Sequence, residues 1–211
     1  MPLQVPDRDC SLCPRLVDFR IQNRATFPEF HNAPVSSFGS LNARLLVVGL
    51  APGLKGANRT ARPFTGDYAG DLLYPTIRAF DFAVGEYGAK SDDGMKLLDC
   101  RITNALRCVP PQNKPVGAEI NACQHFLISE IDAMANLRVI LALGSIAHNS
   151  VLKAFGHTQS AFKFGHAAEH ALLHGPILID SYHCSRYNTN TGRLTTDMFC
   201  DVFRLIRKHL D

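Results

Sequence analysis

Four of the seven cysteines have a spacing that could bind a metal. Cys10 and Cys13 form a C-x2-C pair, and Cys108 and Cys123 follow much later in the chain. A C-x2-C pair can present two thiolates to one metal site, and two further cysteines complete a four-thiolate set. Zinc and an iron–sulfur cluster both accept four thiolates, so the spacing alone leaves both open. Ordinary buried or loop thiols are the alternative.

A second candidate site is the glycine-rich segment 49–67, GLAPGLKGANRTARPFTGD, which follows an apolar run. It contains neither G-x-G-x-x-G nor a final G-K-[ST], which excludes a dinucleotide fingerprint and a P-loop. Phe64 and Asp67 place an aromatic ring and a carboxylate in this polar stretch. Three basic residues add positive charge: Lys55, Arg59 and Arg62. The combination favours a pocket for a flat polar ring carried on a phosphodiester backbone, and a mobile turn is the alternative.

Asn104 is an amide inside the apolar stretch RITNALRC, where an unused amide would be unfavourable. A carboxamide offers one donor and one acceptor, which complement O4 and N3–H of uracil and mismatch cytosine. A hydrogen bond from Asn104 to a neighbouring loop would explain the residue equally well.

Another polar segment begins at His183, where a predicted strand ends. It continues through Ser185, Arg186 and Tyr187, and side chains of this kind commonly contact phosphates or enter a base stack. The segment therefore favours contact with nucleic acid over a plain solvated loop.

These segments need a scaffold that brings them together. Four apolar runs have the character of strands buried on both faces: 44–50, 101–106, 138–144 and 176–182. Segments with helical features separate or follow them: 70–84, 117–136, 145–155 and 195–210. The alternation predicts a three-layer α/β/α sandwich around a four-stranded parallel sheet. Ligands bind such sheets beyond the carboxyl ends of the strands, where the polar segments fall.

Other parts of the chain are less regular. Residues 1–40 have no clear strand character, and the prolines of 109–118 predict a loop. Segment 162–175 is compatible with either an extra edge strand or a ligand-facing loop. The length of 211 residues suits a single domain, 1–211, with the cysteine-bearing segment 1–40 packed on it.

Composition gives weaker indications. The formal net charge of +3 permits a polyanionic partner without requiring one. The charged N-terminus lacks the apolar run of a signal peptide, and no apolar run is long enough to cross a bilayer. We therefore expect a cytoplasmic protein without membrane contact, in which an odd number of cysteines argues against a disulfide framework.

Three segments, in this order and together with the four cysteines, resemble the uracil-DNA glycosylase superfamily: GLAPGLKGANRTARPFTGD, ITNALRCVPPQNKP and HCSRYNTNTGRLT. They are most similar to its type B (family 5) iron–sulfur branch, from Cys10 to the end of the chain. The resemblance implies an α/β/α fold, a 4Fe-4S cluster in preference to zinc, and DNA containing uracil or other deaminated bases as the partner. It implies no protein partner. The implied reaction is hydrolysis of the N-glycosidic bond after base flipping, which leaves an abasic site.

The resemblance also assigns roles to individual residues. Phe64 would stack on the flipped base, Asn104 would read uracil, and His183 would lie near uracil O2. Asp67 would position the attacking water, because Leu50, Ala51 and Pro52 offer no acid within GLAPG. The implied cluster ligands are Cys10, Cys13, Cys108 and Cys123, and the implied substrate contacts include Gly49, Ala51, Gly53, Ser185, Arg186 and Tyr187.

Cys184 and Tyr187 depart from the residues that are common in this family, which leaves the DNA-inserting side chain open. Two other functions are compatible with the residues. One is an iron–sulfur DNA-binding protein that is non-catalytic or traps abasic sites covalently. The other is a hydrolase of free nucleosides or nucleotides.

Overall fold

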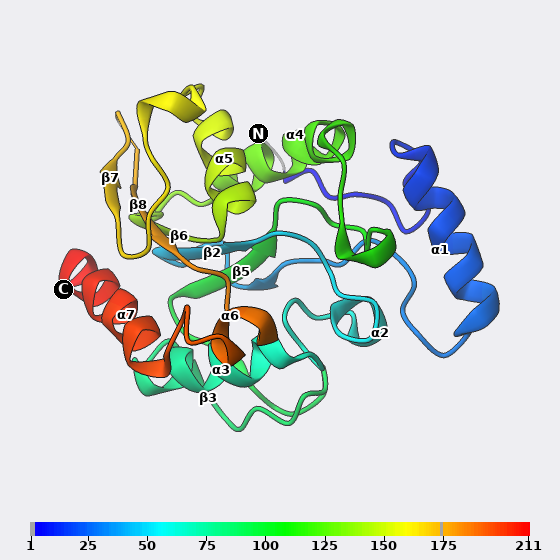
Figure 1. Ribbon diagram of the computed structural model, residues 1–211, viewed down its shortest axis with the longest axis horizontal. Helices are drawn as coiled ribbons and strands as arrows, with labels where there is room; N and C mark the ends of the chain where they lie inside the picture. The colour runs from blue at the N-terminus through cyan, green and yellow to red at the C-terminus, as the bar shows by residue number, and fades with distance from the viewer. Residues whose placement is uncertain (1–2, 174) are drawn as a thin grey trace.

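The computed structural model describes residues 3–173 and 175–211 (Figure 1). Its centre is a six-stranded sheet with the order β1-β5-β2-β6-β8-β7. The four inner strands are parallel, as predicted, and run within two residues of the expected bounds: β5 (Cys100–Asn104), β2 (Leu45–Gly49), β6 (Val139–Leu143) and β8 (Ile177–Ser181). Their carboxyl ends therefore meet at one edge of the sheet.

Two helices cover each face of the sheet and complete the predicted three layers (Figure 1). One face carries α3 (Tyr68–Ala79) and α7 (Thr196–Leu210), and the other carries α4 (Gly117–Ala133) and α5 (Ser145–Ala154). Side chains of a strand alternate between faces, so Val47 packs in the α3–α7 core and Val48 in the α4–α5 core. Burial on both faces explains why β2 and β6 contain no polar side chain, whereas β5 and β8 also bury polar residues such as Thr103 and Asp180.

Short antiparallel strands close both edges of the sheet. β1 (Phe38–Gly39) pairs with β5, and β7 (Glu169–Ala171) pairs with β8. Strand β7 shows that segment 162–175 contributes an edge strand, the first of the two alternatives considered for it. The 3-10 turn η2 (Gln159–Ala161) lies just before this segment. The prediction of four parallel strands is therefore confirmed, and the two antiparallel edge strands bring the complete sheet to six.

The N-terminal segment contains a helix that the sequence did not predict, α1 (Pro14–Thr26). It begins with a proline at its first turn, where the missing N–H costs nothing. Leu16 of α1 packs against Leu106 and Phe126, and the Arg15 guanidinium donates to both carboxylate oxygens of Glu119 in α4 at 2.7 and 2.8 Å. These contacts attach the segment to the sandwich.

The remaining elements lie between the main ones. The predicted helix 70–84 stops at Ala79, and the chain then forms a small hairpin of β3 (Ala83–Val84) and β4 (Lys96–Leu97). Three further turns are α2 (Ala57–Thr60), η1 (Pro111–Asn113) and α6 (Arg186–Asn190). Within the described residues, no helix combines the length and apolar character needed to cross a membrane.

Candidate active site

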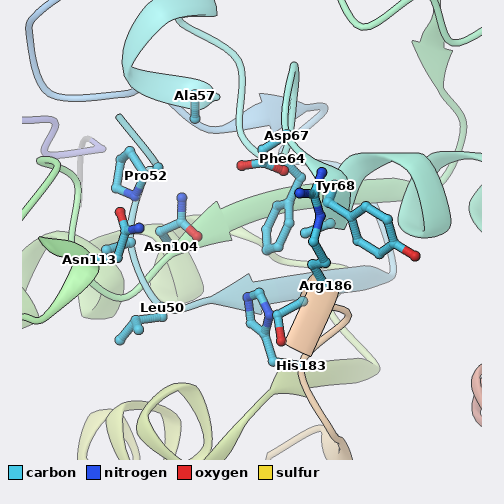
Figure 2. Close-up of a pocket in the computed structure, with 14 residues that line it drawn as sticks. Leu50, Pro52, Ala57, Phe64, Asp67, Tyr68, Asn104, Asn113, His183 and Arg186 are labelled. Atoms are coloured by element: carbon cyan, nitrogen blue, oxygen red, sulfur yellow. The ribbon is translucent and has the colours of Figure 1, made fainter. Parts of the chain in front are cut away.

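The polar segments after β2, β5 and β8 meet around one cavity of about 410 Å³ (Figure 2). Figure 2 shows Asn104, Asn113 and Pro52 on one side, and Phe64, His183, Tyr68 and Arg186 on the other. Eight of the residues predicted from the sequence line it: Ala51, Gly53, Phe64, Asp67, Asn104, His183, Ser185 and Arg186. The sheet edge therefore gathers side chains that are up to 135 residues apart in the chain, from Ala51 to Arg186.

Phe64 forms an apolar wall of the cavity. Its backbone has a φ of +52°, which is uncommon for a residue other than glycine. Its ring is buried, with its centroid 6.0 Å from that of the His183 ring. Gly49 does not line the cavity, but a Cβ there would overlap both the Phe64 ring and Asn104 Oδ1. Gly49 thus gives the two side chains room to approach the strand.

Asn104 is the last residue of β5 and pairs in register with Gly49 of β2. Its side chain is buried, and among the described residues its Oδ1 has no hydrogen-bond partner. Buried polar atoms are normally paired, so an unpaired amide that lines a cavity indicates a ligand with complementary groups.

Asp67 lies at the N-terminus of α3, where its Oδ1 accepts a hydrogen bond from the Gly70 N–H at 3.3 Å. Its other oxygen, Oδ2, lies toward Gly53 and Gly56, and a Cβ at Gly56 would overlap it. Burial raises the pKa of Asp67 above its ordinary value. The site therefore contains a partly desolvated carboxylate with one oxygen free of that helix cap.

His183 follows β8 by two residues and faces the cavity next to Phe64. Burial lowers its pKa to about 4, because a charged imidazolium loses its hydration there. Its backbone carbonyl accepts a hydrogen bond from Asn188 Nδ2 at 2.8 Å, which fixes the chain at this point. At neutral pH the residue is thus an uncharged imidazole that can donate one N–H.

The segment after His183 forms the short helix α6, where the sequence predicted a loop. Ser185 caps it through its hydroxyl, and the Arg186 guanidinium lies 5.1 Å from the centre of the Tyr68 ring. Tyr187 does not line the cavity: it is 71% exposed on the outer side of the helix. The expected contact between Tyr187 and the substrate therefore stays a prediction, and it would involve DNA that lies outside the pocket.

Tyr68 and Asn113 are pocket residues that the sequence reading missed. Asn113 comes from the loop after β5 and has a φ of +57°, a conformation that Asn tolerates better than most residues. The sequence did contain a signal for Asn113, because a polar residue in the loop that follows a parallel strand lies at the ligand-binding edge of the sheet.

One basic residue of segment 49–67 has a different role from the expected one. The Arg62 side chain is only 5% exposed and forms a salt bridge with Asp93 at 2.6 Å. It is therefore a buried structural cation, while Lys55 and Arg59 remain exposed.

The four predicted metal-binding cysteines also come together. Cys10, Cys13, Cys108 and Cys123 line one small cavity between α1, α4 and the loop after β5. Burial, together with the neighbouring Cys123 thiol, raises the pKa of Cys13 to about 11. The site thus favours neutral thiols in the absence of a cation.

The spacing of these thiols bears on which metal they suit. In a tetrahedral zinc site with Zn–S bonds of about 2.3 Å, the sulfurs lie roughly 3.8 Å apart. Among the described residues, the only group with three ligand atoms mutually within 4.8 Å is His148, His170 and Asp180. The four cysteines do not form such a closely spaced group among the described residues, and they share the lining of one cavity.

A family model of the "Uracil DNA glycosylase superfamily" matches residues 36–207. The chain is 44% identical to the Type-5 uracil-DNA glycosylase of Thermus thermophilus, in an alignment covering 92% of this chain and 90% of the relative. It is 38% identical to the Type-5 enzyme of Pyrobaculum aerophilum, with 93% and 87% covered. A Type-4 uracil-DNA glycosylase of Thermotoga maritima is 36% identical over about half of each chain, 52% and 49%. The match over most of its length shows that the chain belongs to the uracil-DNA glycosylase superfamily.

Proposed function

We propose that the protein is a uracil-DNA glycosylase of the Type-5 kind, which hydrolyses the N-glycosidic bond of uracil in DNA during repair. The observation that carries the proposal is Asn104, whose buried, unpaired amide lies in the same cavity as the Phe64 ring and the Asp67 carboxylate. The Phe64 ring offers a surface on which uracil can stack, and the Asn104 amide complements the edge of the base. The Asp67 carboxylate provides a polar group for the sugar side of the glycosidic bond. The Type-5 relatives named above support the same activity.

DNA binding would begin with contacts between phosphates and the exposed basic residues Lys55, Arg59 and Arg186. The damaged nucleotide must leave the duplex, at a cost of a few kcal/mol that is lower for a mismatched base. Its ring would stack on Phe64, and Asn104 would satisfy its own amide by pairing with the O4 and N3–H edge of uracil.

In the chemical step, the C1′–N1 bond breaks and its electron pair stays with uracil. Neutral His183 donates an N–H hydrogen bond to the oxygen on which negative charge develops. The ionised Asp67 carboxylate stabilises the positive charge of the sugar and orients a water molecule toward C1′. The oxygen of this water forms the new bond to C1′, and its proton leaves to Asp67 or solvent, which gives an abasic site and free uracil.

Other deaminated bases belong to the proposed substrate range. A cavity of about 410 Å³ is large relative to one pyrimidine ring. Asn104 selects by hydrogen bonding to the base edge, whereas Phe64 accepts any aromatic ring. Deaminated purines that present a carbonyl oxygen and a ring N–H should therefore compete for the site.

We also propose a 4Fe-4S cluster bound by Cys10, Cys13, Cys108 and Cys123. The four cysteines line one cavity, and a set of four soft thiolates is the usual ligand set of such a cluster, which supports this choice. When bound, the cluster would supply cross-linking between α1, α4 and the loop that carries Asn113, and no redox chemistry is needed. We further propose that residues 1–211 form a single domain and that the protein acts on DNA in the cytoplasm.

The test is incubation with a uracil-containing duplex oligonucleotide, followed by alkali, which cleaves abasic sites. We expect strand breaks and free uracil from the wild type, with Asp67→Asn slower by at least two orders of magnitude but still able to bind DNA. Binding without free uracil would indicate a DNA-binding protein, and a persistent covalent adduct would indicate a trapping protein. Turnover of free nucleosides alone would indicate a nucleoside hydrolase. Each of these three outcomes would refute the proposal.

A further inference from the structure

The loop that carries Phe64 and Asp67 is held from outside the pocket by a segment with no part in the reaction described above. This segment is the β3–β4 hairpin, residues 83–97, which lies beside α3 (Figure 1). Its tip presents two side chains to the loop, Tyr87 and Asp93.

Tyr87 contacts the backbone of the loop directly. Its hydroxyl accepts a hydrogen bond from the Gly66 N–H at 3.1 Å and donates one to the Phe64 carbonyl at 3.3 Å. It thereby connects the backbone on both sides of Thr65. Phe64 has a φ of +52°, and such a conformation persists only where the surrounding contacts determine it.

Asp93 fixes the start of the same loop. Its two oxygens accept hydrogen bonds from the two Arg62 Nη atoms at 2.8 and 2.6 Å, in a bidentate pair that is nearly inaccessible to solvent. The Arg62 Nε donates to the Thr65 hydroxyl at 2.8 Å, which extends the connection into the loop. The Gly88 and Met95 N–H groups donate to Asp93 in turn and hold the carboxylate in place.

Helix α3 is adapted to the same arrangement. A Cβ at Gly70 would overlap both the Phe64 carbonyl oxygen and the Tyr87 hydroxyl. Because Gly70 also donates its N–H to Asp67, one position of the helix accommodates the Tyr87 contact and orients the carboxylate. The wall of the cavity, the acid and the hairpin are thus connected within a few residues.

We propose that Tyr87 and Asp93 are positioning residues for base excision, which hold residues 62–67 so that the Phe64 ring and the Asp67 carboxylate face the flipped nucleotide. The inference rests on the proposed function for the identity of the reaction. Neither side chain lines the cavity, so both act through the loop. If the hairpin only added stability, its contacts would affect folding without affecting the rate of the folded enzyme.

Tyr87→Phe tests this role because it removes one oxygen and keeps the ring, which stacks on Tyr74. We expect the single-turnover rate of uracil release to fall about tenfold, because both hydrogen bonds between the Tyr87 hydroxyl and the loop backbone are lost. The Kd for DNA and the melting temperature should stay close to wild type. Glu86→Gln is the matched control, since Glu86 is the neighbouring residue, its side chain is 84% exposed, and it pairs with Arg78 at the surface.

A second measurement does not depend on activity. Hydrogen–deuterium exchange of a peptide covering 62–67 should become about tenfold faster in Tyr87→Phe, because the Gly66 amide loses its acceptor, and should be unchanged in Glu86→Gln. Asp93→Asn should also slow uracil release and speed up exchange in peptide 62–67. It should in addition lower the melting temperature, because Arg62 keeps a buried charge without its counter-ion. An unchanged excision rate in Tyr87→Phe would overturn the proposal, with or without faster exchange.

If the wild-type protein releases no uracil, the proposed function fails, and the exchange experiment still decides whether Tyr87 holds the loop. Faster exchange then supports the positioning contact for whatever reaction the pocket performs. Unchanged exchange overturns it.

Discussion

Two ionisable side chains in the pocket are shifted in opposite directions by the same cause. Burial disfavours charge, so it raises the pKa of the Asp67 carboxyl and lowers that of His183 to about 4. At neutral pH the pair therefore consists of an uncharged N–H donor and a carboxylate with reduced hydration. The donor suits the developing uracil anion, and the carboxylate suits the developing sugar cation.

This pair predicts how the rate depends on pH. We expect the single-turnover rate to stay level through pH 6.5, the ordinary pKa of histidine, because His183 remains neutral there. The rate should then fall in acid as Asp67 is protonated, at a pH above its ordinary pKa of 3.8. A pH–rate profile between pH 4.5 and about 8 measures both effects. A loss of rate centred near pH 6.5 would contradict the assignment.

The lowered pKa of His183 also makes the stability of the fold depend on pH. The folded-state pKa of His183 lies below its unfolded value, so its contribution to stability is complete above pH 6.5. It is lost as the pH falls from 6.5 toward 4, because the unfolded chain takes up a proton that the folded chain refuses. His183→Gln should therefore show a smaller fall in melting temperature over this range than the wild type.

The unpaired amide of Asn104 predicts a change in selectivity. A carboxylate cannot donate a hydrogen bond to the O4 of uracil, so Asn104→Asp should lower uracil excision by about a hundredfold or more. Competition between uracil and cytosine oligonucleotides measures the change. If the variant kept the wild-type preference, another group would have to read the base. Gln at the same position is an informative comparison, because it retains the amide at the wrong distance.

At the scale of elements, α3 carries the constraint that is easiest to test. Replacing a helical glycine by alanine ordinarily stabilises a helix by up to about 1 kcal/mol. Gly70→Ala should do the opposite, because its Cβ would overlap the Phe64 carbonyl oxygen and the Tyr87 hydroxyl. Gly117→Ala in α4 is the matched control, since among the described residues no atom beyond the adjacent backbone lies within 4 Å of its added Cβ. Thermal unfolding should show a lower melting temperature for Gly70→Ala alone, and equal values for both variants would contradict the close approach.

The elements also show how far the sequence can predict the structure. Apolar runs located all four parallel strands, most clearly β2 and β6, which contain no polar side chain because both faces of the sheet are covered. Helix α1 was missed because its contact face is short and its first turn is anchored by Arg15 to a distant glutamate. The sequence places Arg62 among the charges of the glycine-rich segment, but it does not reveal the partner Asp93, because a local pattern contains no information about pairs 31 residues apart.

At the scale of the whole molecule, the cysteine site joins three parts of the chain. Cys13 immediately precedes α1, Cys108 follows β5, and Cys123 lies within α4. Outside this site, α1 has few buried side chains, of which Leu16 is its main apolar contact with the sandwich. The proposed cluster at this junction would therefore stabilise the attachment of the N-terminal segment more than it would stabilise the central sheet.

This arrangement predicts the outcome of removing one thiol. Cys123→Ala should lose absorbance near 400 nm and most of its iron, which would otherwise be close to four atoms per chain for one 4Fe-4S cluster. Limited proteolysis should then cut within residues 3–30, while the sheet and its four flanking helices resist. Cys200→Ala is the matched control, because Cys200 lies in α7, away from the cysteine site. A colourless wild-type protein that contains zinc would refute the cluster, and an unchanged proteolysis pattern in Cys123→Ala would refute its role in holding α1.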